Sequence, residues 1–356
     1  MKRLHYILIL TGILAGFFFS FISGGIVIKY YSNTVWTIYK KIFVWDDAPD
    51  HSWPDSYKIV SIQSTADAQN QKAYFRKAHA SLKPLLVSLH AWSGDFRQDD
   101  PLADIAMQYD WNYIHPDFRG PNWTKDACLS KKVISDIDDA IQYAIDNGTV
   151  DLENIFIVGE SGGGYATLGA FLRTKHKIKA FLAWVPISDL VAWFYESENR
   201  DSKYANDILN CTSSSKNATP DIKEAKKRSP IFWDIPEYSN GRLEIFAGIK
   251  DGYTGSVPVS HSILFFNRLA RHYGYSKSEV EASDIIKLVT RGVSRGSASE
   301  KIGSRGVLYS KNIPQASLTI FDGSHEMLPE YCFKRLQEIA EQGAVPDDFS
   351  AVLQSR

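Results

Sequence analysis

The chain of 356 residues is long enough for one large domain or two small ones, and 44% hydrophobic and 23% charged residues are typical of a globular protein. The formal net charge of -1 excludes the polyelectrolyte character of proteins that bind nucleic acid, so we expect no nucleic-acid partner. The sequence holds no CxxC pair, HExxH motif or glycine-rich phosphate loop, and we therefore expect no metal and no cofactor.

The N-terminus carries a long apolar segment. Two basic residues precede the run from Ile7 to Ile28, which would span about 33 Å as a helix, enough to cross a bilayer. We predict a signal anchor over 1–29 that places the rest of the chain outside the cytoplasm, in the periplasm or the extracellular space. The alternative is a secreted protein after cleavage of a signal peptide near Ser23.

After a short stalk at 30–54, strand and helix patterns alternate along the chain. The expected strands are 57–64 and 73–79, paired at a sheet edge, then 85–89, 111–115, 154–158, 178–185, 243–247 and 317–321. The expected helices are 130–147, 165–173, 257–272 and 327–342. This alternation predicts an α/β fold with a mostly parallel central sheet and helices on both faces.

Two intervals interrupt this alternation. Residues 188–241 are rich in Ser, Asn, Lys and aromatic residues, and we predict a small helical cap there. Residues 274–314 are polar and basic, and we expect a solvated surface insertion, with a surface for an acidic ligand as the alternative. The predicted domain organisation is an anchor at 1–29, a stalk at 30–54 and a catalytic domain at 55–356 that carries the cap.

The segment from Gly159 to Gly163 matches the G-x-S-x-G pattern of a nucleophile elbow. The strand at 154–158 runs directly into it and a helical pattern follows, so Ser161 would lie on a tight turn where glycines relieve side-chain clashes. The helix N-terminus after Ser161 favours developing negative charge at this point. We therefore predict that Ser161 is the nucleophile of a serine hydrolase with the α/β-hydrolase fold.

A serine hydroxyl needs a base, and the chain has nine histidines. In this fold the acid and then the histidine follow the serine, each after a strand. Five histidines precede Ser161, His176 follows an expected helix rather than a strand, and His261 and His272 lie in or at the end of an expected helix. Only His325 follows a strand, and we predict that it is the general base.

Asp251 follows the strand at 243–247 and is the predicted acid that orients His325 and stabilises its imidazolium. Asp322 and Asp189 are the alternatives, because each also follows a strand.

The tetrahedral oxyanion needs two backbone donors. We predict the N–H groups of Gly162 and Trp92, with Ala91 as the alternative to Trp92, and expect His90 to hold this loop. Aromatic residues near strand ends or in the cap are candidates for the substrate pocket: Trp123, Trp193, Tyr204 and Tyr253.

The three cysteines fit a place outside the cytoplasm. Cys128 and Cys211 lie in polar, loop-like stretches, and an oxidising compartment would permit a bridge between them. Cys332 lies in an apolar-periodic helix and is expected to be a buried thiol.

Several motifs resemble those of prolyl-oligopeptidase-type α/β-hydrolases. They are the elbow followed by Gly163-Gly164-Tyr165, Ser229-Pro230, Asp251 followed by Val257-Pro258 and His261-Ser262, and Asp322-Gly323-Ser324-His325-Glu326. The resemblance runs from Pro84 to the C-terminus. Peptidases of that group usually carry an N-terminal β-propeller, and about 55 residues between the anchor and Pro84 are too few for one. Similar propeller-free domains are often carboxylesterases, including enzymes that remove acetyl or feruloyl groups from polysaccharides.

These observations predict a membrane-anchored serine hydrolase that acts outside the cytoplasm. We expect it to cleave a small-molecule or polysaccharide ester by a Ser-His-Asp acyl-enzyme mechanism. A serine peptidase of the prolyl-oligopeptidase type is one alternative, and a catalytically silent hydrolase fold that serves as a binding module is another.

Overall fold

The structure is a computed structural model that describes residues 53–213, 218–292 and 300–342. The predicted anchor and nearly all of the predicted stalk lie outside these ranges. No helix within the described ranges has both the length and the apolar character needed to cross a bilayer. The described residues belong to the unit from Ala48 to Arg356.

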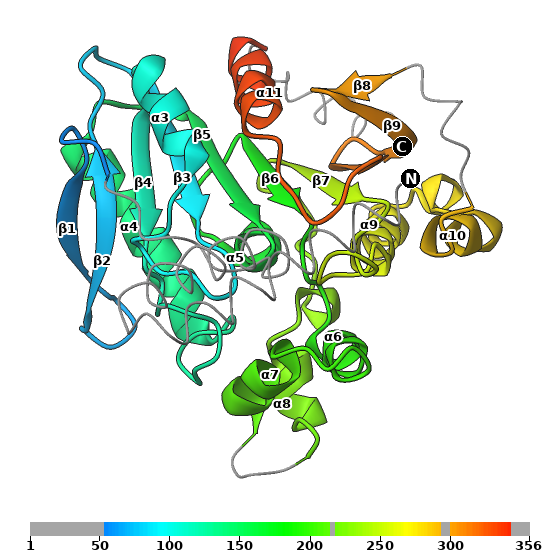
Figure 1. The fold of residues 1–356 in the computed structure, drawn as a ribbon. Coiled ribbons are helices and arrows are strands. Elements are labelled where there is room, and N and C mark those ends of the chain that lie inside the picture. The colour runs from blue at the N-terminus through cyan, green and yellow to red at the C-terminus, as the bar shows by residue number, and fades with distance from the viewer. Residues whose placement is uncertain (1–52, 214–217, 293–299, 343–356) are drawn as a thin grey trace, which may run out of the picture. The chain divides into compact units, whose positions relative to one another are not determined.

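The strand patterns form one ten-stranded sheet in the described part of the chain, with the order β1-β2-β4-β3-β5-β6-β7-β10-β9-β8 (Figure 1). Its parallel centre consists of β3 (Lys83–Leu89), β4 (Asn112–Pro116), β5 (Val150–Glu160), β6 (Ala180–Trp184), β7 (Arg242–Gly248) and β10 (Ala316–Phe321). The antiparallel strands are β1 (Lys58–Gln63) and β2 (Asn70–Arg76) at one edge, and β9 (Arg305–Asn312) and β8 (Lys301–Ile302) at the other.

Burial follows the position of each strand in the sheet. Every residue of β4 and β6 is buried, because helices cover both faces of the centre and leave no solvated side. Strand β1 lies at an edge and is mostly exposed. The central strands therefore contain nearly continuous apolar runs, which made them visible in the sequence.

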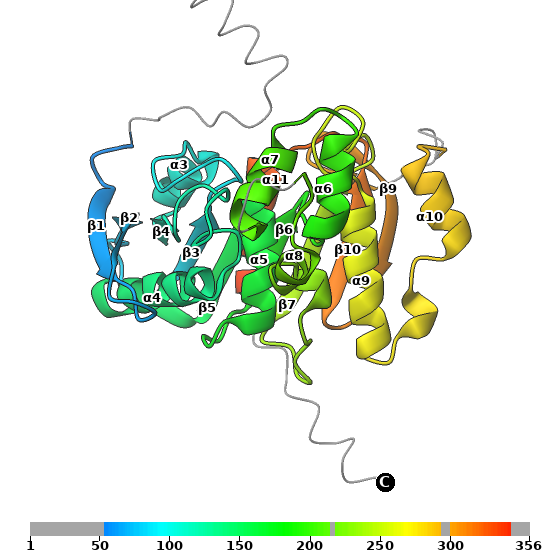
Figure 2. The same cartoon turned by 90° about the horizontal axis from the view of Figure 1, so that it is seen from below.

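Helices cover the two faces of the sheet as separate layers (Figure 2). One layer contains α4 (Lys131–Asn147), α5 (Gly162–Arg173) and α9 (Ser260–His272), and the other contains α3 (Pro101–Gln108) and α11 (Pro329–Glu341). Each layer encloses its own hydrophobic core. Helix α4 begins after Ser130, whose side chain accepts the Lys132 N–H, and it ends at Gly148.

The interval 188–241 adds helices beside the sheet rather than strands within it. It contains α6 (Leu190–Glu198), α7 (Tyr204–Thr212), α8 (Ile222–Lys227) and the short 3-10 helix η1 (Pro230–Phe232). A disulfide joins Cys211 in α7 to Cys128 before α4, so the bridge that the sequence permitted is present. Cys332 is a buried free thiol, as predicted, and burial raises its pKa well above the usual value.

The prediction of a surface insertion at 274–314 was wrong for its second half. Strand β9 pairs with β10 and extends the sheet, and β8 pairs with β9. Its polar residues concealed it, because an edge strand keeps much of its surface in water and lacks a continuous apolar run. The first half forms the 3-10 helix η2 (Ser276–Ser278) and α10 (Ala282–Val289). Sequence patterns also missed α3, which is only eight residues long.

Candidate active site

Ser161 lies on the sharp turn between β5 and α5. Its backbone has φ 57° and ψ -114°, a left-handed conformation that non-glycine residues rarely adopt. A Cβ atom at Gly159 would lie 2.2 Å from the backbone carbon of Gly163, so the turn cannot close with a side chain there. The glycines of the motif are therefore required by the close approach of strand and helix, as the sequence indicated.

Asp251 and His325 follow the neighbouring parallel strands β7 and β10, whose last residues Gly248 and Phe321 are in register. The His325 Nδ1 atom lies 2.8 Å from Asp251 Oδ2, and the two side chains are 5% and 1% exposed. The Asp251 Oδ1 atom accepts hydrogen bonds from Gly252 N at 2.9 Å and Val257 N at 3.0 Å. Both carboxylate oxygens thus have hydrogen-bond partners, so neither is left unpaired in the buried site.

The alternative acids have other partners. Asp322 forms an ion pair with Lys250 at 2.8 Å. The Asp189 side chain caps α6 by accepting hydrogen bonds from the first-turn N–H groups of Val191 and Ala192. The geometry therefore brings Asp251, and neither alternative, to the Nδ1 side of His325.

Two backbone N–H groups face the elbow. Gly162 is the first residue of α5, where an N–H has no acceptor within the helix. A Cβ atom at Gly162 would lie 2.2 Å from Trp92 N, so the loop after β3 packs directly on the helix start. The Ala91 N–H donates to Gln98 Oε1 at 2.7 Å, whereas the Trp92 N–H has no acceptor among the described residues. This difference favours Trp92 over Ala91 as the second donor.

His90 and the cap hold the loop after β3. The two ring nitrogens of His90 lie 2.9 Å from Ala91 O and 2.8 Å from Asp117 O, and the ring stacks on Phe118 at 3.8 Å. On the cap side, Trp92 Nε1 donates to Asp207 Oδ2 at 3.1 Å. The position of the Trp92 backbone thus depends on contacts with both the sheet domain and α7.

A loop at 252–257 surrounds the Asp251–His325 pair and was missed by the sequence reasoning. The Ser256 Oγ atom lies 3.2 Å from His325 Nε2. A Cβ atom at Gly255 would lie 2.4 Å from Asp251 Oδ1 and 2.5 Å from His325 Cβ. The only signal in the sequence is that this glycine and this serine follow the predicted acid within five residues.

The cap holds this loop from outside. Arg200 after α6 donates to the carbonyl oxygens of Gly252 and Ser256, each at 2.8 Å, and Trp193 Nε1 donates to Ser256 O at 2.8 Å. A shift of α6 would therefore move the loop that touches His325.

The four predicted pocket aromatics occupy three different environments. Trp193 and Tyr204 are buried and stack on each other at 4.9 Å, and the Trp193 ring also meets Trp92 at 4.7 Å. Trp123 is partly exposed, with Lys203 Nζ 5.4 Å from its ring. Tyr253 is 52% exposed and donates its hydroxyl to Val289 O. Trp193 thus contacts Trp92 in the loop after β3, and Tyr204 packs behind Trp193.

The described residues contain no group of three or more His, Cys, Asp or Glu side chains arranged to hold a metal ion.

Burial raises the pKa of Tyr165, the residue four positions after Ser161, well above its usual value. Its phenol therefore stays neutral and donates to Arg228 O at 2.5 Å, which links α5 to the cap.

The strand order and the elbow define the class of protein, a serine hydrolase with an α/β-hydrolase-like fold. The sequence model of the prolyl oligopeptidase family matches residues 110–286, just under half of the chain. The resemblance noted in the sequence is confirmed. No curated protein matches the sequence at a significant level.

Several solved structures share the fold. An acylaminoacyl peptidase in complex with Z-Gly-Gly-Phe-chloromethyl ketone is 15% identical with a TM-score of 0.53, and the match covers 81% of this chain and 41% of that one. The Pyrococcus horikoshii acylaminoacyl peptidase is 15% identical with a TM-score of 0.54, and coverage is 86% and 42%. A puromycin-hydrolyzing peptidase of Mycobacterium tuberculosis is 16% identical with a TM-score of 0.52, and coverage is 80% and 38%. The chain spans about two fifths of the length of these proteins.

Proposed function

We propose that the protein hydrolyses carboxylic esters through a Ser161-His325-Asp251 triad. Ser161 attacks the substrate carbonyl, His325 takes the hydroxyl proton and later gives it to the leaving alcohol, and Asp251 holds the imidazole in the required tautomer. Water then resolves the acyl-enzyme by the same steps. The observation that carries this proposal is the 2.8 Å contact between His325 Nδ1 and the buried Asp251 carboxylate, together with the positive φ of the Ser161 backbone at the elbow.

The N–H groups of Gly162 and Trp92 are proposed to bind the oxyanion. Both are backbone donors without an acceptor among the described residues, and both lie where the β3 loop meets the start of α5. Donors already oriented toward a developing charge stabilise it without reorganisation, and each is worth about 10²- to 10³-fold in kcat.

The His325 Nε2 atom must exchange partners during this cycle. Ser256 Oγ lies 3.2 Å from it in the structure, whereas the mechanism requires contact with the Ser161 hydroxyl and the leaving group. Catalytic hydrogen bonds are often loose before substrate binds, so Ser256 holds the ring until the reacting groups arrive.

Ester substrates are favoured because an alcohol leaves a tetrahedral intermediate more readily than an amine does. The aromatic cluster formed by Trp92, Trp193 and Tyr204 is buried, and it supports the loop after β3 from behind. An acetylated or feruloylated carbohydrate is the substrate class that we propose to screen first.

Peptide cleavage is the second candidate, because the solved structures that share the fold are peptidases by name. The discriminating experiment compares kcat/KM for p-nitrophenyl acetate and acetylated xylan with kcat/KM for aminoacyl-proline anilides. The proposal expects higher values for the esters and loss of all turnover in Ser161→Ala. Faster anilide cleavage would select the peptidase, and unchanged ester turnover in Ser161→Ala would exclude both.

We also propose that the segment 1–29 anchors the catalytic domain at 55–356 to a membrane, outside the cytoplasm. The support is the apolar run from Ile7 to Ile28. Cell fractionation tests this proposal: the full chain should sediment with membranes and resist extraction by carbonate. Recovery of a shortened chain in the soluble fraction would instead indicate a cleaved signal peptide.

A further inference from the structure

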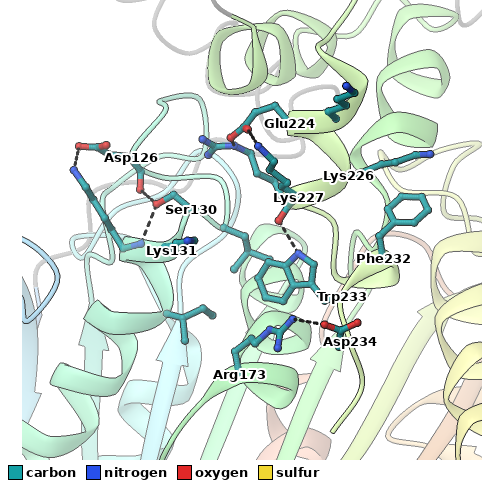
Figure 3. A pocket seen from close by; sticks show the side chains of 15 residues that line it. Asp126, Ser130, Lys131, Arg173, Glu224, Lys226, Lys227, Phe232, Trp233 and Asp234 are labelled. Carbon is teal, nitrogen blue, oxygen red and sulfur yellow. Dashed lines mark hydrogen bonds and ion pairs between the residues drawn. The ribbon is translucent and has the colours of Figure 1, made fainter.

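An open pocket lies between the cap and the helices beneath it (Figure 3). Its volume is about 920 Å³, and its walls come from the start of α4, the end of α5, α8 and η1. Ser161, Asp251 and His325 do not line it. Pockets of this size hold small organic ligands, so the volume suits a molecule rather than an ion alone.

The walls carry an excess of positive charge. Seven of the fifteen lining residues are Lys or Arg, and three are Asp or Glu. Two of these cations share one carboxylate: Arg228 Nε lies 2.9 Å from Glu224 Oε1, and Lys227 Nζ lies 3.3 Å from Glu224 Oε2. The ion pair between Arg173 and Asp234 is long, at 3.9 Å between nitrogen and oxygen, and the Asp234 side chain is fully exposed to water. The residues that line the pocket therefore carry a net positive charge.

Three of the lining lysines have no ion pair with a carboxylate among the described residues: Lys131, Lys223 and Lys226. Lys131 is the first residue of α4, and Lys223 and Lys226 belong to α8 on the other wall. Lys226 Nζ lies 5.2 Å from the Phe232 ring, and all three lysines are exposed. Their unbalanced ammonium groups make the surroundings of the pocket attractive to an anion.

The floor between these walls is apolar and aromatic. The Trp233 ring is fixed by a hydrogen bond from its Nε1 to Lys227 O at 2.7 Å, and the Arg173 guanidinium lies 5.5 Å from this ring. Leu129 and Ile134 add aliphatic surface. A ligand that satisfies both parts of the pocket carries a negative group and an apolar body.

We propose that this pocket binds an amphipathic organic anion, namely a carboxylate or phosphate attached to an aliphatic or aryl body. The anionic group lies at the basic rim beside Lys131, and the body lies against Trp233. Two sources supply this chemistry, a free organic acid and an anionic lipid.

The test is calorimetric titration of the full chain in dilute detergent with three ligands that share a ten-carbon tail: decanoate, decanol and decyltrimethylammonium. Decanoate should bind saturably at one site, at least tenfold more tightly than either of the others. Dihexanoylphosphatidylglycerol, compared with dihexanoylphosphatidylcholine, tests the lipid source. Equal affinities for decanoate and decanol would overturn the proposal.

Lys131→Glu is the decisive variant. An acidic residue in the first turn of a helix is favourable, so folding should not suffer, and p-nitrophenyl ester turnover should stay at the level of the unmodified protein. Decanoate affinity should fall at least tenfold. The matched control is Lys58→Glu, which changes an exposed lysine on the edge strand β1. This variant should bind decanoate normally. Unchanged affinity in Lys131→Glu, or an equal loss in Lys58→Glu, would refute the site.

Discussion

Replacing Asp251 by Asn should disable the enzyme without unfolding it, because of how the hydrogen bonds around this side chain are arranged. Asp251 Oδ1 accepts two backbone N–H groups, and Oδ2 faces His325 Nδ1. An asparagine must keep its oxygen toward the two N–H groups, since turning its NH₂ toward them would leave two buried donors unpaired at about 1–3 kcal/mol each.

The NH₂ group of that asparagine would then face His325 Nδ1, which must become an acceptor. The ring proton moves to Nε2, and the nitrogen that should receive the Ser161 proton no longer has a free lone pair. A wrong tautomer of this kind lowers kcat by about 10³- to 10⁴-fold, or about 4–5.5 kcal/mol of transition-state stabilisation.

The assay is steady-state hydrolysis of p-nitrophenyl acetate, with circular dichroism to confirm that Asp251→Asn is folded. Asp322→Asn is the matched control, because Asp322 pairs with Lys250 and should keep activity within a few-fold of the unmodified enzyme. A kcat within tenfold of normal for Asp251→Asn, or a larger loss for Asp322→Asn, would refute the assignment of the acid.

Three further outcomes follow from the geometry. Gly255→Ala should lower kcat at least about 100-fold, because its Cβ would lie 2.5 Å from His325 Cβ; activity within threefold would contradict this. Changing Cys128 and Cys211 to Ser opens a loop of 83 residues and should lower the free energy of unfolding by about 2–4 kcal/mol, measured in urea; unchanged stability would argue against the bridge. Burial lowers the pKa of His115 to about 4, so the unfolded chain binds a proton that the folded chain excludes. Stability should fall by about 3 kcal/mol as pH drops from about 6.5 to 4, and His115→Phe should lose this dependence in urea unfolding at pH 7 and 4.5.

The central sheet was readable from the sequence because its strands are buried on both faces. The runs 85–89 and 243–247 lie within β3 and β7, and the Ser130 and Gly148 signals mark the ends of α4. Strand β9 was not readable, since it lies near an edge and carries polar residues. Burial pattern thus decides which strands the sequence reveals.

The residues of the active site likewise divide into those that the sequence could place and those that it could not. Residues at the ends of strands can be placed from order alone, because the carboxyl ends of parallel strands meet at one edge; Asp251 and His325 were placed this way. The loop carrying Ser256 follows no periodic pattern, and its contacts with Arg200 and Trp193 cross from cap to sheet domain. Such contacts depend on how the cap folds, which periodicity does not specify.

The mechanism's central claim is that Ser161 is an activated nucleophile. The most direct measurement is mass spectrometry of the folded protein after treatment with a fluorophosphonate probe, followed by peptide mapping. We expect one adduct per chain, located on Ser161, absent from Ser161→Ala and formed far more slowly in His325→Ala. Absence of an adduct in folded, unmodified protein, or an adduct that persists in Ser161→Ala, would contradict it.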